Sequence, residues 1–252
     1  MRIVVAFAMD QEFGPWRRSH PFERQGHPKP PVFGIHLDGA DVHVVLTGIG
    51  PRSARNAMKA ALESHADVCI STGLAGGLRS RHRSGDVLAA QAVLDPSGVV
   101  LERCEETLLR GAVACGAREV EAFRSIERII PTAAEKMRLA VSADAVEMES
   151  YVVLAEARAA GVPAVAVRVV GDTAEQDLPL DFSKSLGASG RVSLPGVLAQ
   201  LARHPLRIPA VARLGQQTQR AASRLAGFLD RYVRYLATGR ASQEFLSEVA
   251  AG

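Results

Sequence analysis

The stretch AVAVRVVGDT, residues 164–173, decides the fold. Residues 164–170 form a strongly β-prone run that only Arg168 interrupts, and Asp172 follows where the strand is expected to end. Gly161 and Pro163 stand just before it and are typical of the end of a preceding helix. A short apolar run that follows a helix predicts a buried strand of an α/β sheet.

Charged residues gather on both sides of that helix. The segment AVEMES, residues 145–150, places Glu147 and Glu149 at its start, and the helix is predicted over 147–160. A charge inside an apolar run is costly unless it is paired or used. Several charges that converge on strand ends favour a functional site. A purely structural ion pair of Arg168 with Glu147 or Glu149 stays open.

Strands and helices alternate along most of the chain. Asp38–Gly39 between two apolar runs predicts a hairpin, and the five prolines of residues 14–31 predict a loop. The other predicted strands cover 2–8, 67–71, 86–94, 99–104 and 119–126, and the other helices 53–64, 105–114 and 132–139. This pattern predicts a mixed α/β sheet with helices on both faces.

The last part of the chain differs in charge. Residues 191–252 hold nine arginines against three acidic residues and carry +6, so the remaining residues carry −3 of the net +3. We therefore predict a catalytic domain over 1–190 and a basic, amphipathic helical extension over 191–252, with a helix at 197–237 broken at Pro205 and Pro209. Such a tail fits an anionic membrane surface, a cover of the domain or a subunit interface. Its few aromatic residues argue against nucleic acid.

Composition excludes other classes. Cys69, Cys104 and Cys115 are widely spaced, which argues against a disulfide framework and a zinc site, and the seven histidines show no metal spacing. We expect no metal ion. The first residues are too short an apolar run for a signal peptide, and no run is long enough to span a bilayer. We expect a cytoplasmic protein, with peripheral contact to the inner membrane face through residues 191–240 as a further expectation.

Three more segments carry candidate chemistry. AMDQE, residues 8–12, follows the first strand, where a carboxylate such as Glu12 can act as a base, although a surface acid is the simpler interpretation. TGIGPR, residues 47–52, offers the Gly50 amide and Arg52 for an anion. STGLAGG, residues 71–77, is a predicted glycine-rich turn that lets backbone approach a ligand at Gly73, Leu74, Ala75 and Gly76.

Together these segments resemble the nucleoside phosphorylase/nucleosidase superfamily over residues 1–185. The matching pieces are AMDQE, TGIG, STGLAGGL with SGDVL, AVEMES and VRVVGDTAEQ, and they are most similar to methylthioadenosine/S-adenosylhomocysteine nucleosidases. The resemblance implies a three-layer α/β/α fold with a central mixed sheet, and cleavage of a ribosyl–base bond without a cofactor.

The resemblance also implies roles. Glu12 looks like the base that activates water, and Asp172 like the acid that protonates N7 of a leaving adenine. Glu149 would accept the ribose hydroxyls with Met148 packed on the sugar, and Arg168 would steady the carboxylates. Glu147 and the glycine-rich segment complete the predicted substrate site.

The nucleophile remains open between water and phosphate. Ser71 and Leu74 stand where phosphorylases of the superfamily carry Arg and Ser, and the acids near the first strand would repel an anion. We therefore favour hydrolysis. Arg52 keeps open phosphorolysis to ribose 1-phosphate, with phosphate as co-substrate.

Three departures narrow the resemblance. The GDAF-like base loop has no counterpart in the shortened stretch that contains IIPT, residues 129–132, Gly171 replaces the usual Ser, and the chain continues past residue 190. With VEMES and the Arg-rich tail, the chain resembles the hopanoid-associated phosphorylase branch, which implies a nucleoside with a bulky apolar 5′ group such as adenosylhopane. We also expect a homo-oligomer. A non-catalytic nucleoside-binding protein and a membrane-surface protein are the alternative classes.

Overall fold

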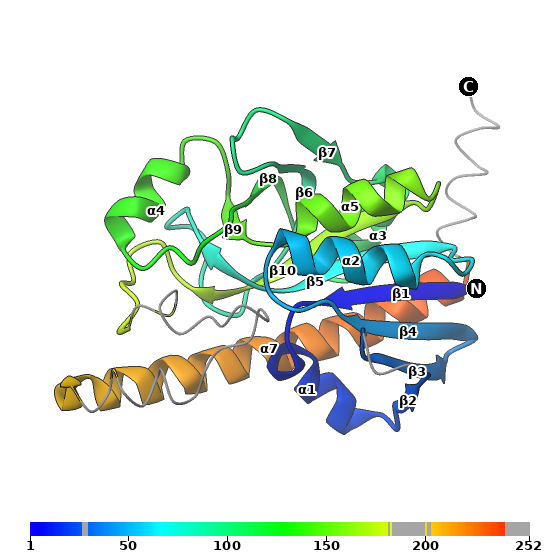
Figure 1. Ribbon diagram of the computed structural model, residues 1–252, viewed down its shortest axis with the longest axis horizontal. Coiled ribbons are helices and arrows are strands. Elements are labelled where there is room, and N and C mark those ends of the chain that lie inside the picture. Colours follow the sequence, from blue (N-terminus) through cyan, green and yellow to red (C-terminus); the bar gives the residue numbers. More distant parts are fainter. Residues whose placement is uncertain (27–29, 181, 183–199, 201–202, 240–252) are drawn as a thin grey trace.

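The computed structural model describes residues 1–26, 30–180, 182, 200 and 203–239 (Figure 1). They form one ten-stranded mixed sheet with helices on both faces, which confirms the predicted α/β class. The strands are β1 (Arg2–Phe7), β2 (Glu23–Gln25), β3 (Val32–Leu37), β4 (Ala40–Leu46), β5 (Val68–Gly77), β6 (Val87–Leu94), β7 (Leu101–Arg103), β8 (Arg118–Ser125), β9 (Ala145–Glu147) and β10 (Ala164–Asp172). The helices are α1 (Asp10–Ser19), α2 (Pro51–Ala61), α3 (Glu106–Ala114), α4 (Ala133–Leu139), α5 (Ser150–Ala159), the 3₁₀ turn η2 (Pro205–Arg207) and α7 (Ile208–Ala237).

The centre of the sheet is parallel. β1 pairs in parallel with both β4 and β5, and β5 pairs in parallel with β10. Beyond them β5, β10, β6, β8 and β9 pair successively, and β9 returns to β5, so these five strands close a ring. The carboxyl ends of β1, β4, β5 and β10 therefore lie at one edge of the sheet.

Side chains of β1 point alternately to the two faces of the sheet and contribute to a hydrophobic core on each face. Ile3, Val5 and Phe7 face a hydrophobic cluster with α1, α3 and α7, whereas Val4 and Ala6 face a second cluster with α2 and α5. Successive side chains of a strand point to opposite faces, so a strand apolar throughout is buried on both.

α7 forms part of one helical layer. Its second half is buried in the same cluster as the sheet, through Leu225, Phe228, Leu229 and other side chains between residues 221 and 236. One of the alternatives for the tail was that its helices cover the domain. Within the described residues, this second half of α7 does so. Its first half, from Ile208 to Arg220, contributes no buried side chain and extends past the sheet (Figure 1). The boundary at residue 190 lies outside the described residues and stays a prediction.

Several predicted elements were wrong. Residues 14–31 are not one loop, because α1 begins at Asp10 and tolerates Pro15, while Phe13 and Trp16 anchor it in the core. Pro209 does not break a helix, because it lies in the first turn of α7, where proline's missing N–H costs nothing. The remainder of the predicted helix, at 197–199 and 201–202, lies outside the described residues.

The glycine-rich segment was also predicted wrongly as a turn. Residues 72–77 continue β5, because this stretch is held by β10 on one side and, at Gly76 and Gly77, by β9 on the other. Similarly, Glu147 ends a short strand and α5 begins only at Ser150.

Candidate active site

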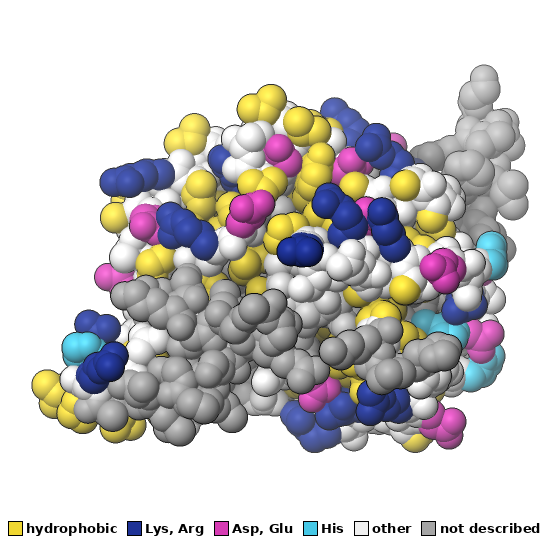
Figure 2. Space-filling view, in the orientation of Figure 1, with side chains coloured by type: hydrophobic (Ala, Val, Ile, Leu, Met, Phe, Trp, Pro, Cys, Tyr) yellow, Lys and Arg dark blue, Asp and Glu magenta, His cyan; other side chains and the backbone are white. Residues whose placement is uncertain are grey.

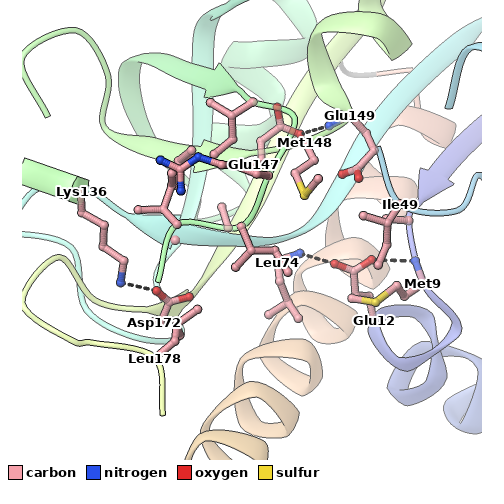
Figure 3. A pocket seen from close by; sticks show the side chains of 18 residues that line it. Met9, Glu12, Ile49, Leu74, Lys136, Glu147, Met148, Glu149, Asp172 and Leu178 are labelled. Atoms are coloured by element: carbon pink, nitrogen blue, oxygen red, sulfur yellow. Dashed lines mark hydrogen bonds and ion pairs between the residues drawn. The ribbon is translucent and has the colours of Figure 1, made fainter. Parts of the chain in front are cut away.

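A cavity of about 220 Å³ opens at the carboxyl edge of the parallel strands. Figure 3 shows Asp172 and Lys136 on one side of it and Glu12 and Glu149 on the other. The wall between them is largely apolar. The lining residues are Ala8, Met9, Glu12, Ile49, Leu74, Ala75, Gly76, Ile126, Arg128, Ile129, Ile130, Lys136, Val146, Glu147, Met148, Glu149, Asp172 and Leu178.

Glu12 lies in the first turn of α1 and is only 3% exposed, so it is not a surface acid. Its Oε2 accepts the Met9 amide at 3.0 Å, and its Oε1 accepts the Leu74 amide of β5 at 2.8 Å. Burial raises the pKa of Glu12, and the Arg168 charge and these backbone amides oppose that rise. The carboxylate is thus fixed in orientation and is a stronger base than an exposed glutamate.

Gly73 makes this arrangement possible. Its φ of +137° suits glycine, and a Cβ there would lie 2.6 Å from Arg168 Nη1 and 2.8 Å from Glu12 Oε1. The glycine therefore lies behind the cavity wall and admits the two charged groups.

Arg168 is buried beneath the cavity rather than in its lining. Nη2 donates to Glu147 Oε2 at 2.6 Å, Nη1 to the Thr72 carbonyl at 2.8 Å and Nε to Ser150 Oγ at 3.1 Å. Glu147 also accepts the amides of Glu149 and Ser150 and the Ser125 hydroxyl. The sequence left open that Arg168 forms a structural ion pair with Glu147, and this pair is present in the core. The polar groups of Arg168 and Glu147 are thus bonded to other protein groups.

Glu149 connects this network to the turn after β4. Its Oε1 accepts the Gly50 amide at 2.8 Å, and Oε2 lies 3.7 Å from Arg168 Nη2. Burial raises the pKa of Glu149 to about 8, opposed by Arg168 and assisted by the Glu147 charge. The carboxyl group can therefore exchange a proton near neutral pH.

Asp172 ends β10 on the other side of the cavity. Burial raises its pKa, and the adjacent Lys136 ammonium, which donates to Oδ2, opposes the rise. A carboxylic acid with a raised pKa is the group that proton donation to a leaving group requires.

Most of the predicted site residues meet here. The cavity is lined by Glu12, Leu74, Ala75, Gly76, Glu147, Met148, Glu149 and Asp172. The predicted phosphate site does not join them: Arg52 is exposed and outside the lining, and the Gly50 amide already donates to Glu149. Within the described residues no group of three or more His, Cys, Asp or Glu is arranged to hold a metal ion.

Lys136 was missed from the sequence. It lies on α4 one helical turn before Leu139 and Ala140, which pack against a small core cluster. A lysine on the apolar face of a short helix was the available signal. Ser125 and Ser150, which support Glu147 and Arg168, carried no signal of their own.

Buried carboxylates with raised pKa values around a cavity at the strand ends define an enzyme site for a small molecule. A family model described as the phosphorylase superfamily matches residues 2–105 and 101–234. The chain belongs to this superfamily, and its second matched segment includes most of α7. The prediction of an enzyme of the nucleosidase or nucleoside phosphorylase class is confirmed at this level.

Named relatives agree. A 5′-methylthioadenosine/S-adenosylhomocysteine nucleosidase of Shewanella halifaxensis is 28% identical over 232 residues, 80% of this chain and 99% of the relative. That of Shewanella sediminis is 29% identical over 236 residues, with the same coverage. Among solved structures, the Campylobacter jejuni nucleosidase gives a TM-score of 0.72 at 17% identity, covering 93% of this chain and 99% of its own. The Neisseria meningitidis nucleosidase in complex with methylthio-immucillin-A gives 0.70 at 18%, covering 92% and 98%. The structural similarity supports the fold.

Proposed function

We propose that the protein hydrolyses the N-glycosidic bond of an adenosine-type nucleoside with a bulky apolar 5′ group, such as adenosylhopane, and releases adenine. The observation that carries this proposal is the opposition of Asp172 to Glu12 and Glu149 across one cavity (Figure 3). Cleavage needs an acid beside the leaving nucleobase and a carboxylate beside the sugar. Asp172 supplies the acid, and Glu12 and Glu149 supply the carboxyl groups on the sugar side. The largely apolar lining suits an apolar substituent.

In this proposal the C1′–N9 bond breaks and its electron pair leaves with the base. Asp172 gives its proton to N7, which makes the base a better leaving group. A water molecule adds its oxygen to C1′ and gives a proton to Glu12. Glu149 holds the ribose hydroxyls, and in its ionised form its negative charge stabilises the oxocarbenium character of the sugar.

Two observations favour water over phosphate as the nucleophile. The Gly50 amide is occupied by Glu149, and Arg52 lies outside the cavity. An anionic phosphate beside the Glu12 carboxylate would meet like charge.

Product analysis tests this proposal. An adenosine with an apolar 5′ group is incubated with the protein, with and without phosphate. Free adenine and free sugar without phosphate would support hydrolysis. Strict dependence on phosphate, with ribose 1-phosphate as product, would replace it by phosphorolysis. Release of no base would favour the alternative of a non-catalytic nucleoside-binding protein.

We also propose that η2, the residues just before it and the first half of α7 contact an anionic membrane surface. Leu206 is 95% exposed and Ile208 51% exposed beside Arg203 and Arg207. Figure 2 shows apolar, basic and histidine side chains gathered at this end of the molecule. Among the described residues no helix is both long and apolar enough to cross a membrane, so this contact would be peripheral. The homo-oligomer stays a prediction.

A further inference from the structure

Lys136 is a fully buried lysine at the edge of the cavity. Its Nζ donates to Asp172 Oδ2, to the Thr173 carbonyl at 2.7 Å and to the Gln176 carbonyl at 2.9 Å. An ammonium group has three donors, so each proton of Lys136 already has a protein acceptor.

The loop that supplies these acceptors is held from its other side. Gln217 of α7 donates to the Gly171 carbonyl at 2.7 Å and to Gln176 Oε1 at 2.9 Å. Ser84 Oγ also donates to the Gly171 carbonyl, at 3.2 Å. Lys136 therefore meets a fixed carboxylate in a fixed loop.

The lysine also determines which Asp172 oxygen is free. Oδ2 is occupied by Nζ, which leaves Oδ1 to carry a proton. The other charged side chains that line the cavity are Arg128, Glu12, Glu147 and Glu149. Arg128 pairs with Glu135 at 3.1 Å, and Glu12, Glu147 and Glu149 accept the donors described above. Among these side chains Lys136 alone has an ion pair with Asp172 in the structure.

We propose that Lys136 is a positioning residue that orients the Asp172 proton and stabilises the carboxylate left after that proton is transferred. This inference rests on the proposed function. When the C1′–N9 bond breaks, the Oδ1 proton of Asp172 moves to N7, the leaving base becomes neutral and Asp172 becomes an anion. The Lys136 charge offsets this new anion, so Asp172 is a stronger acid than burial alone would leave it. All three Lys136 donors have protein acceptors, so Lys136 acts on the reaction through Asp172.

The pH profile tests this role. The acid must be protonated, so kcat/KM falls as pH rises through the pKa of Asp172. In Lys136→Met that pKa rises further, because burial is no longer opposed. We expect the alkaline limb to move to higher pH and the plateau kcat to fall about 10- to 100-fold, which is typical for loss of a charge-assisted hydrogen bond. KM should change little, and Lys136→Arg should restore much of kcat.

Two measurements separate this role from damage to the loop. In an Asp172→Asn background, Lys136→Met should add little further loss, whereas a structural effect would multiply the two losses. The Asp172 carboxyl carbon, titrated by ¹³C NMR and assigned with Asp172→Asn, should ionise at higher pH in Lys136→Met, a result independent of turnover. Lys59→Met, on the exposed face of α2, is the matched control.

The outcomes are distinguishable. If the wild-type protein releases no nucleobase, the proposed function is contradicted. The NMR titration still tests whether Lys136 lowers the pKa of Asp172. Base release with an unmoved limb and an unmoved carboxyl titration in Lys136→Met overturns the assignment of Lys136 alone. Equal losses from Lys136→Met with and without Asp172 would reduce the lysine to a loop anchor.

Discussion

The Arg168 guanidinium shows how a buried charge is made tolerable by its neighbours. It donates to Glu147, Ser150 and the Thr72 carbonyl, and so it replaces lost water with fixed acceptors. Its planar fork serves several acceptors at once, which a lysine ammonium does not reproduce. The same group lowers the pKa values of Glu12 and Glu149 from the values that burial alone would give. Arg168 thus acts on the cavity through the carboxylates.

Arg168→Met is expected to lower the free energy of unfolding by about 3–5 kcal/mol, because Glu147 would keep its burial and lose its cation. Urea denaturation followed by circular dichroism measures this. Arg168→Met combined with Glu147→Gln should recover part of the loss, since the unpaired charge is gone. An unchanged urea midpoint in the single variant would contradict the account of the pair.

Glu149 is expected to make stability depend on pH. Its pKa is about 8 in the folded protein against an ordinary value of 4.5, so the folded state holds a proton that the unfolded chain releases earlier. Its contribution is therefore fully present below about pH 4.5 and is lost as pH rises toward 8. Glu149→Gln should flatten the fall in melting temperature between about pH 5 and 8.

The matched control for that experiment is Glu63→Gln, because Glu63 is exposed just after the end of α2. It should keep the wild-type slope. If the melting temperature of Glu149→Gln falls with pH as steeply as that of wild type, ionisation of Glu149 does not destabilise the folded protein.

Asp172→Asn should reduce turnover by about two to four orders of magnitude, the usual contribution of a general acid. Binding of the nucleoside, measured by calorimetry, should survive because the amide keeps the shape of the group. Asp10→Asn is the control, since Asp10 is exposed and pairs with Arg17 outside the cavity. Turnover that is unaffected in Asp172→Asn would remove the acid assignment.

At the scale of the element, β5 is the part of the fold that brings the site together. It supplies Leu74, Ala75 and Gly76 to the lining and the Leu74 amide to Glu12. Its Gly73 leaves room for Arg168 and Glu12 to approach. A strand that also pairs with β9 and β10 fixes these groups more tightly than a loop would.

Gly73→Ala is therefore expected to cost activity beyond its cost in stability. The new Cβ would overlap Arg168 Nη1 and Glu12 Oε1, so both must shift by a few tenths of an ångström or more. Misplacement of a catalytic group on this scale reduces kcat strongly. The control is Gly161→Ala, where φ is also positive, at +70°, but nothing lies within 4 Å. Equal kcat values in the two variants would contradict this role for Gly73.

How far the sequence predicts these elements depends on the range of the forces that form them. The β3–β4 hairpin and the end of α5 at Gly161 follow from local turn chemistry and were predicted. The continuation of β5 past residue 71 depends on pairing with β9 and β10, which no local pattern contains. α1 was missed because the prolines of residues 14–31 outweighed Phe13 and Trp16, which pack in the core.

The site divides in the same way. Glu12, Glu149 and Asp172 were predicted because each follows or flanks a strand. β1 and β10 run parallel to β5 and deliver Glu12 and Asp172 to one edge of the sheet, whereas Glu149 follows β9, which runs antiparallel to β5. Lys136 was missed because only tertiary packing turns its face of α4 toward Asp172. Arg52 lies outside the cavity lining, and a glycine turn before a helix offers amides without revealing that Glu149 already accepts one.

At the scale of the whole molecule, the two halves of α7 lie in different environments. Its second half is buried against the sheet, and Trp16 Nε1 and His20 Nε2 of the α1 region both contact Asp230 Oδ1, at 2.6 and 2.7 Å. Its first half extends past the sheet (Figure 1). This half carries the exposed side chains of Ile208, Arg213 and Arg220. Asp230 is the first acidic residue after residue 200, so the extending half carries positive charge alone.

That asymmetry leads to a vesicle experiment. The protein should sediment with vesicles that contain phosphatidylglycerol and much less with pure phosphatidylcholine, and salt should weaken the binding, because exposed charges are screened over about 10 Å at 0.1 M. Leu206→Glu with Ile208→Glu should abolish it, since both exposed apolar side chains at this end would become anionic. Val99→Glu with Val141→Glu makes the same change in charge at two other exposed side chains and should leave binding intact. If both double variants bind vesicles like wild type, this end of the molecule does not contact the lipid. If Leu206→Glu with Ile208→Glu instead changes how the protein sediments without vesicles, and the control variant does not, the surface joins two copies of the chain.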